Sequence, residues 1–166
     1  MNTENIHRSF EPSNFSAANY FRLVDSLSSD GYENVDFTTV DPSRKHLVLR
    51  HDIDFDMEAA AGLARMEQTH GYSATYFVLL TGEFYNPISE RGRKALASII
   101  SCGHDIGLHF DTAIHGEDAD ALSRAAEQEC QILETLSGRA VNVISMHRPP
   151  SALIGKDVNF AGRLNT

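Results

Sequence analysis

This sequence has few of the features that would place it in a specialised class. Only two of its 166 residues are cysteine, Cys102 and Cys130, and they lie far apart in two stretches with helical spacing. Two such separated cysteines make neither a disulfide framework nor a zinc ribbon, so we interpret both as thiols of the core. The sequence also contains no internal repeat and no low-complexity segment.

Long apolar runs and clusters of basic residues are missing as well. No apolar run approaches the ~20 residues needed to cross a bilayer, and residues 1–16 contain no hydrophobic signal core. Lys and Arg total 14 against 23 Asp and Glu, which gives a formal charge of −9. These absences argue against a nucleic-acid or membrane partner, and the cytoplasm is the compartment that we expect.

What is present has the length and composition of one domain. Apolar residues make up 42% and charged residues 22% of the chain, as in ordinary soluble globular proteins. A chain of this length can bury a substantial core. Residues 1–12 are polar and are predicted to form a flexible N-terminus, and residues 13–166 are predicted to form a single domain.

Strands and helices are predicted to alternate after a first helix. The spacing of apolar residues indicates helices over residues 16–29, 57–69, 89–102 and 118–136. Apolar and β-branched runs indicate strands over residues 46–54, 74–80, 105–110 and 141–146, with a short edge strand at 35–40. This alternation indicates parallel strands joined by right-handed crossovers, so the expected class is α/β with an extra N-terminal helix.

Two acids stand at the end of the first long strand. Because side chains alternate along a strand, Asp52 and Asp54 point to one face, while His51 and Ile53 point to the other. Two carboxylates on one face repel each other. The pair therefore requires a cation, an arginine or a shared proton to compensate.

Polar residues also follow the later strands. His109, Asp111 and, further on, His115 follow the third, and Ser145, His147 and Arg148 end the fourth. Ligands of parallel α/β folds bind where the carboxyl ends of the strands open. Asp and His are usual ligands of zinc and related ions, and a carboxylate that binds no metal can accept a proton. These residue types indicate metal-assisted hydrolysis of a carbonyl-type bond.

Three segments resemble the first three motifs of the polysaccharide deacetylase (NodB-homology) superfamily. They are Arg50-His51-Asp52-Ile53-Asp54, Gly103-His104-Asp105-Ile106-Gly107-Leu108-His109 and His147-Arg148-Pro149-Pro150, within residues 46–150. The resemblance implies a distorted or partial (β/α) barrel, a divalent metal with zinc as the first choice, and removal of acetyl groups from sugars. It also implies Asp52 as general base, Asp54 and His109 as metal ligands, and Arg148 as the arginine that steadies the base.

The sequence departs from the family pattern at the third metal ligand. The family places a second histidine four residues after His109, where this chain has Ala113. His115, His147 and Asp111 are the alternatives that remain open. On its own, His109 also allows a second interpretation, a core histidine that donates to a backbone carbonyl.

The C-terminal part departs from the pattern too. Ser151 stands where an aromatic residue normally lines the acetyl pocket, and the family's later motifs have no counterpart before Thr166. We therefore expect a shortened or C-terminally truncated domain. A homo-oligomer is one way to cover the open barrel edge that such a domain would have.

Three functions follow from these observations. The first is a metal-dependent deacetylase that acts on carbon–nitrogen bonds other than peptide bonds, with an acetylated carbohydrate or similar small molecule as substrate. The second is a sugar-binding relative that kept the fold and lost turnover, which Ala113 favours. The third is an Asp-x-Asp phosphatase, although Asp56 stands where that pattern requires Thr or Val.

Overall fold

A computed structural model describes residues 16–116, 118–149, 151 and 162–166. The predicted flexible segment 1–12 lies outside the described residues. The helices are α1 (Ala17–Ser29), α2 (Met57–His70), α3 (Glu90–Ser101), α4 (Ala119–Ser137) and the short 3₁₀ turn η3 (Thr112–Ile114). The strands are β1 (Glu33–Asn34), β2 (His46–Leu47), β3 (Arg50–Ile53), β4 (Thr75–Val78), β5 (Asp105–Asp111), β6 (Val143–His147) and β7 (Leu164–Asn165).

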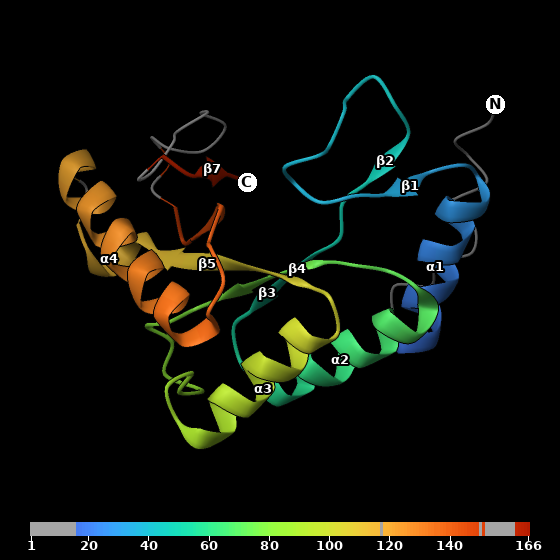
Figure 1. Ribbon diagram of the computed structural model, residues 1–166. Coiled ribbons are helices and arrows are strands. Elements are labelled where there is room, and N and C mark those ends of the chain that lie inside the picture. The colour runs from blue at the N-terminus through green and yellow to red at the C-terminus, as the bar shows by residue number, and fades with distance from the viewer. Residues whose placement is uncertain (1–15, 117, 150, 152–161) are drawn as a thin grey trace.

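The main sheet has five parallel strands in the order β3-β4-β5-β6-β7 (Figure 1). β1 and β2 pair in a separate parallel sheet of two strands. The predicted α/β class, its parallel pairing and its N-terminal helix are therefore confirmed. In the part of the chain that the structure describes, β3 and β7 are the edges of the main sheet and do not pair with each other as strands.

The predicted strand over residues 46–54 is divided in two. β2 pairs with β1, β3 pairs with β4, and the chain passes from one sheet to the other between them. The edge strand predicted at 35–40 is wrong, because the Asp36 carboxylate accepts hydrogen bonds from the backbone N–H groups of Thr38 and Thr39. Such a side-chain turn competes with strand pairing, and it moves the pairing segment back to β1.

The helix boundaries follow from their caps. The Asp56 side chain accepts hydrogen bonds from the N–H groups of Glu58 and Ala59 and so begins α2, while Gly71 ends it with a left-handed backbone at φ 80°. Ser16, Ser89 and Asp118 cap the other helices in the same way. None of the helices in the described ranges is long and apolar enough to cross a membrane.

One face of the main sheet carries the core. In Figure 1, α2 and α3 lie side by side below the strands, and α4 lies at the left, beside β5. Apolar side chains of alternate strand positions pack with these helices; they include Tyr76, Val78, Ile106, Leu108, Phe110 and Ile144 from the strands and Ala61, Leu96, Ile99, Leu122 and Leu133 from the helices. The remaining strand positions therefore face the opposite side, which carries Asp52, His109 and His147.

We call this second face, which carries Asp52, His109 and His147, the curved face, because one side chain links its two edge strands. A Cβ atom at Gly107 would lie 2.5 Å from the Phe77 ring, so only glycine allows that ring to pack against β5 on this face. The Arg50 guanidinium lies 5.1 Å from the centre of the same ring and donates to the Thr166 carbonyl oxygen at 3.2 Å. Since Arg50 is in β3 and Thr166 follows β7, the two edges approach within the length of one side chain.

Candidate metal centre

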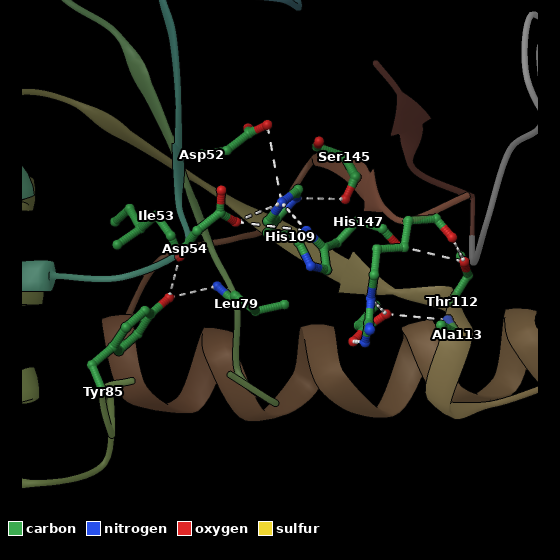
Figure 2. Close-up of polar contacts among 12 residues, drawn as sticks. Asp52, Ile53, Asp54, Leu79, Tyr85, His109, Thr112, Ala113, Ser145 and His147 are labelled. Atoms are coloured by element: carbon green, nitrogen blue, oxygen red, sulfur yellow. Dashed lines mark hydrogen bonds and ion pairs between the residues drawn. The ribbon is translucent and has the colours of Figure 1, made fainter. Parts of the chain in front are cut away.

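Three side chains from three strand ends meet on the curved face (Figure 2). Asp54 follows β3, His109 is in β5, and His147 ends β6. The distance between Asp54 Oδ1 and His109 Nε2 is 3.3 Å, that between Asp54 Oδ1 and His147 Nδ1 is 3.6 Å, and that between the two ring nitrogens is 3.1 Å. The sequence-based expectation that Asp54 and His109 lie close together is confirmed.

These three atoms have the spacing of one face of a zinc tetrahedron. Zinc lies about 2.0–2.1 Å from nitrogen and oxygen ligands, which places neighbouring ligands of a tetrahedron about 3.3–3.4 Å apart. The three measured separations bracket that value. Of the alternatives for the third ligand, the structure therefore brings His147 to the pair.

The hydrogen bond of His109 Nδ1 fixes which ring nitrogen faces the other two side chains. Its Nδ1 lies 3.2 Å from the backbone oxygen of Ser145, which can only accept, so Nδ1 carries the hydrogen and Nε2 carries the lone pair. Burial lowers the pKa of His109 and outweighs the opposing effect of Asp52 and Asp54. A neutral imidazole with its lone pair on Nε2 is the form that binds a metal, and this lone pair faces His147 Nδ1 at 3.1 Å. The bond to a backbone carbonyl that one interpretation of His109 required is present, and it orients the ring so that Nε2 faces Asp54.

Asp54 supplies the test of whether the site fits a cation. Its Oδ1 atom is buried, and no group in the described residues donates a hydrogen bond to it. A buried carboxylate oxygen without a partner loses its hydration without compensation, which is costly. The acceptors His109 Nε2 and Asp54 Oδ1 face each other, so a cation between them satisfies both.

Asp52 lies beside the three atoms and is held by an arginine. Its Oδ2 is 4.0 Å from His109 Nε2. Arg50 donates from Nε to Asp52 Oδ1 at 2.9 Å and from Nη2 to Asp52 Oδ2 at 2.8 Å, and it also contacts the Ser145 hydroxyl. This two-point contact orients the carboxylate and balances its charge.

The family resemblance implied Arg148 for that task, and the structure shows a different pairing. Arg148 forms an ion pair with Asp111, so it does not contact Asp52. Its backbone has φ 52°, which turns it away from the direction that His147 takes at the end of β6. The signal for Arg50 was in the sequence: it precedes Asp52 by two residues, so the strand places both on one face.

His115 and Asp111 are both engaged outside the centre. The His115 Nε2 atom lies 2.9 Å from Glu129 Oε1, and its ring stacks on Phe110. The η3 turn redirects the chain after Asp111, so His115 faces α4. Asp111 binds Arg148 and the N–H of Ala113. Neither residue joins the three atoms described above.

A second group of histidines and acids lies on the core face of the sheet. Glu67 of α2 is fully buried and accepts hydrogen bonds from the Tyr20 and Tyr76 hydroxyls, and His51 Nε2 lies 2.6 Å from its Oε1. The nearby His104 is also buried and contacts the backbone of Ala64 and Ala74. His51 and His104 therefore belong to the hydrogen-bond network of the core face.

Known proteins resemble this chain in fold, although the sequence comparisons find no match. No protein-family model matches the chain, and no curated protein matches it. Several solved structures do match. The deacetylase PplD of Streptococcus pyogenes has a TM-score of 0.56 and 15% identity over 74% of this chain, and IcaB of Ammonifex degensii has 0.56 and 15% over 82%. A CE4 family pseudoenzyme of Bacillus anthracis has 0.52 and 13% over 75%.

The matched proteins are longer than this chain. The match spans 58% of PplD, 69% of IcaB and 38% of the pseudoenzyme. At such low identity, the likeness concerns the arrangement of strands and helices. The resemblance indicated by the three sequence motifs is therefore confirmed at the level of the fold: this chain has the fold of the CE4 polysaccharide deacetylases, at low sequence identity and over part of their length.

Proposed function

We propose that this protein is a metal-dependent hydrolase that removes an acetyl group from a sugar or a related amide. The observation that carries the proposal is the buried, unpartnered Asp54 Oδ1 facing His109 Nε2 at 3.3 Å and His147 Nδ1 at 3.6 Å. The fold is shared with structures named as deacetylases, among them the peptidoglycan deacetylase PdaC of Bacillus subtilis, with a TM-score of 0.52.

Asp54, His109 and His147 would hold the cation, and zinc suits this donor set. The cation would supply Lewis acidity and lower the pKa of water in the site. Asp52 accepts the proton of the attacking water, because its carboxylate lies beside the cation site and is not needed as a ligand. Arg50 keeps that carboxylate oriented through two hydrogen bonds.

The experiment that tests this proposal measures zinc content and acetate release on the same variants. We expect zinc-loaded protein to release acetate from an N-acetylglucosamine oligomer and no phosphate from a phosphomonoester. Asp52→Asn should abolish acetate release while zinc stays bound, and His109→Ala should lose zinc. Acetate release by Asp52→Asn, or unchanged zinc stoichiometry in His109→Ala, would show that these roles are wrong.

A second candidate function is a binding protein without turnover. Ala113 stands at the position where the family pattern has a ligand histidine, and the fold is also shared with a protein described as a CE4 family pseudoenzyme. A variant of that pseudoenzyme is described as having restored enzymatic activity. Zinc binding and sugar binding without acetate release would select this candidate.

A further inference from the structure

Arg163 connects the start of the short strand β7 to α4 and to the segment before β6. Its Nη1 donates to Glu127 Oε2 at 2.7 Å, and its Nη2 donates to Glu134 Oε1 at 3.2 Å, both on α4. Its Nε donates to the Val141 carbonyl oxygen at 2.7 Å. The Arg163 side chain is only 13% exposed, so this arginine is built into the domain on three sides.

The strand that follows Arg163 has few bonds of its own. The Leu164 N–H donates to the Asn142 carbonyl oxygen at 3.1 Å, and the Thr166 N–H donates to the Ile144 carbonyl oxygen at 2.9 Å. Strands of globular proteins usually have at least about three residues, and β7 has two. The position of Thr166 therefore depends on the bonds of Arg163 as well as on pairing with β6.

The Thr166 carbonyl oxygen in turn contacts the arginine that holds Asp52. Arg50 Nη1 donates to this oxygen at 3.2 Å, while Arg50 Nε and Nη2 donate to the Asp52 carboxylate. Arg50 Nη2 also contacts the Ser145 hydroxyl, which belongs to β6. One guanidinium thus bonds to β3, to β6 and to the residue after β7.

The contacts outside β3 decide where the Arg50–Asp52 pair points. Both side chains start from one strand, two residues apart, and they are 34% and 30% exposed. Two flexible side chains that bind only each other can turn together toward solvent, because holding them in one direction costs side-chain entropy. Ser145 is fully buried and supplies one fixed point, and Thr166 supplies the second.

We propose that Arg163 is a positioning residue of the curved face, which acts through β7, the Thr166 carbonyl oxygen and Arg50 on the direction of Asp52. The inference rests on the proposed function for its consequence in catalysis, where Asp52 is the proton acceptor. Among the hydrogen bonds and ion pairs of the described residues, none joins a candidate metal ligand to Arg163 or Thr166. Zinc binding should therefore not depend on Arg163.

The test follows the Arg50 Nε–H group by NMR in the whole chain. An N–H group that donates a hydrogen bond exchanges slowly with water, so its exchange rate reports the Arg50–Asp52 pair without any turnover. We expect Arg163→Met to make this exchange about tenfold faster and to leave zinc affinity unchanged. Arg163→Lys keeps a cation beside α4 and should recover part of the protection. Arg124→Met, which changes an exposed arginine of α4, is the matched control and should change neither.

A milder variant keeps the test decisive if Arg163→Met does not fold. Glu127→Ala removes one ion pair of Arg163 from a helical position, and alanine favours the helix. It should make the Arg50 Nε–H exchange about threefold faster. In assays of acetate release, Arg163→Met should lower kcat about fivefold and leave KM unchanged, because Asp52 acts in the chemical step.

The outcomes separate the positioning role from the proposed function. An Arg50 Nε–H exchange rate that neither Arg163→Met nor Glu127→Ala changes overturns the role of Arg163. Faster exchange together with lost zinc affinity in Arg163→Met also overturns it, because Arg163 then supports the whole curved face. If exchange becomes faster as expected but the unsubstituted protein with zinc releases no acetate, the positioning of Asp52 stands and the hydrolase proposal fails.

Discussion

The two faces of the main sheet each carry a group of histidines and acids, and the groups differ in how their hydrogen bonds are satisfied. On the core face, Glu67 is surrounded by Tyr20, Tyr76 and His51, and both of its oxygens have partners. On the curved face, Asp54 Oδ1 is buried beside His109 and His147 without a donor. Residue type alone would not distinguish these groups.

The difference shows what each group does for the protein. A buried carboxylate with a full set of donors stabilises the folded state through those bonds. A buried carboxylate oxygen without a hydrogen-bond donor is a cost to the fold, and such a cost persists where a ligand offsets it. The Glu67 group therefore joins α1 and α2 to the sheet, and the Asp54 group is expected to bind a cation.

The largest expected effect concerns the stability of the core-face group. Glu67→Ala should lower the free energy of unfolding by about 3 kcal/mol, because it leaves the buried Tyr76 hydroxyl and the half-buried Tyr20 hydroxyl without their acceptor. Urea denaturation of the metal-free protein measures this loss. Glu67→Gln keeps the side-chain shape and should lose less. A loss below about 1 kcal/mol for Glu67→Ala would contradict the proposed structural role.

The matching substitution on the curved face, Asp54→Ala, should change stability little and zinc binding strongly. Asp54→Ala is expected to change the free energy of unfolding of the metal-free protein by less than about 1 kcal/mol, because Oδ1 makes no hydrogen bond. Removing a group that only supports a ligand weakens metal affinity about 10–100-fold, so removing Asp54 itself should weaken zinc binding at least about 100-fold. Zinc should raise the melting temperature of the unsubstituted protein and not that of Asp54→Ala. Equal zinc affinity in both proteins would remove the distinction between the two faces.

A smaller effect is expected when the two arginines of the curved face are compared. Arg50→Lys should reduce acetate release about tenfold, because lysine does not reproduce the two-point contact with Asp52. Arg148→Lys should leave the rate within about threefold, since its partner is Asp111. If Arg148→Lys reduced acetate release more than Arg50→Lys, Arg148 would have the role that the family resemblance implies.

The smallest expected effect is a pH dependence that belongs to the core face. Burial alone would raise the pKa of Glu67, but hydrogen bonds from His51, Tyr20 and Tyr76 outweigh it and lower the pKa. A carboxyl group with a lowered folded pKa stabilises the protein above its unfolded pKa of about 4.3, and this stabilisation disappears as the pH falls through the folded value. The free energy of unfolding should therefore fall between about pH 5 and 3, and less steeply in Glu67→Gln. Equal slopes in the two proteins would show that Glu67 is not the group responsible.

Much of the fold follows from local sequence patterns. Apolar spacing and capping residues place α2 within a residue of its ends, because Asp56 and Gly71 act on the backbone next to them. Strand alternation likewise separates Asp52 and Asp54 from Ile53. The short strand β7 lies in a stretch with weak sequence signals, and the division between β2 and β3 depends on which sheet each segment joins.

The sequence by itself determined the α/β order, the two acids on one face and the pairing of Asp54 with His109 across strand ends. Only the tertiary structure decided that His147 and not His115 meets them, and that Arg50 and not Arg148 holds Asp52. Alternation is a property of one strand, so it can be read from residue numbers. Contacts between residues that follow the ends of different strands depend on the path of the backbone beyond each strand. The η3 turn after β5 and the positive φ of Arg148 after β6 are two such places.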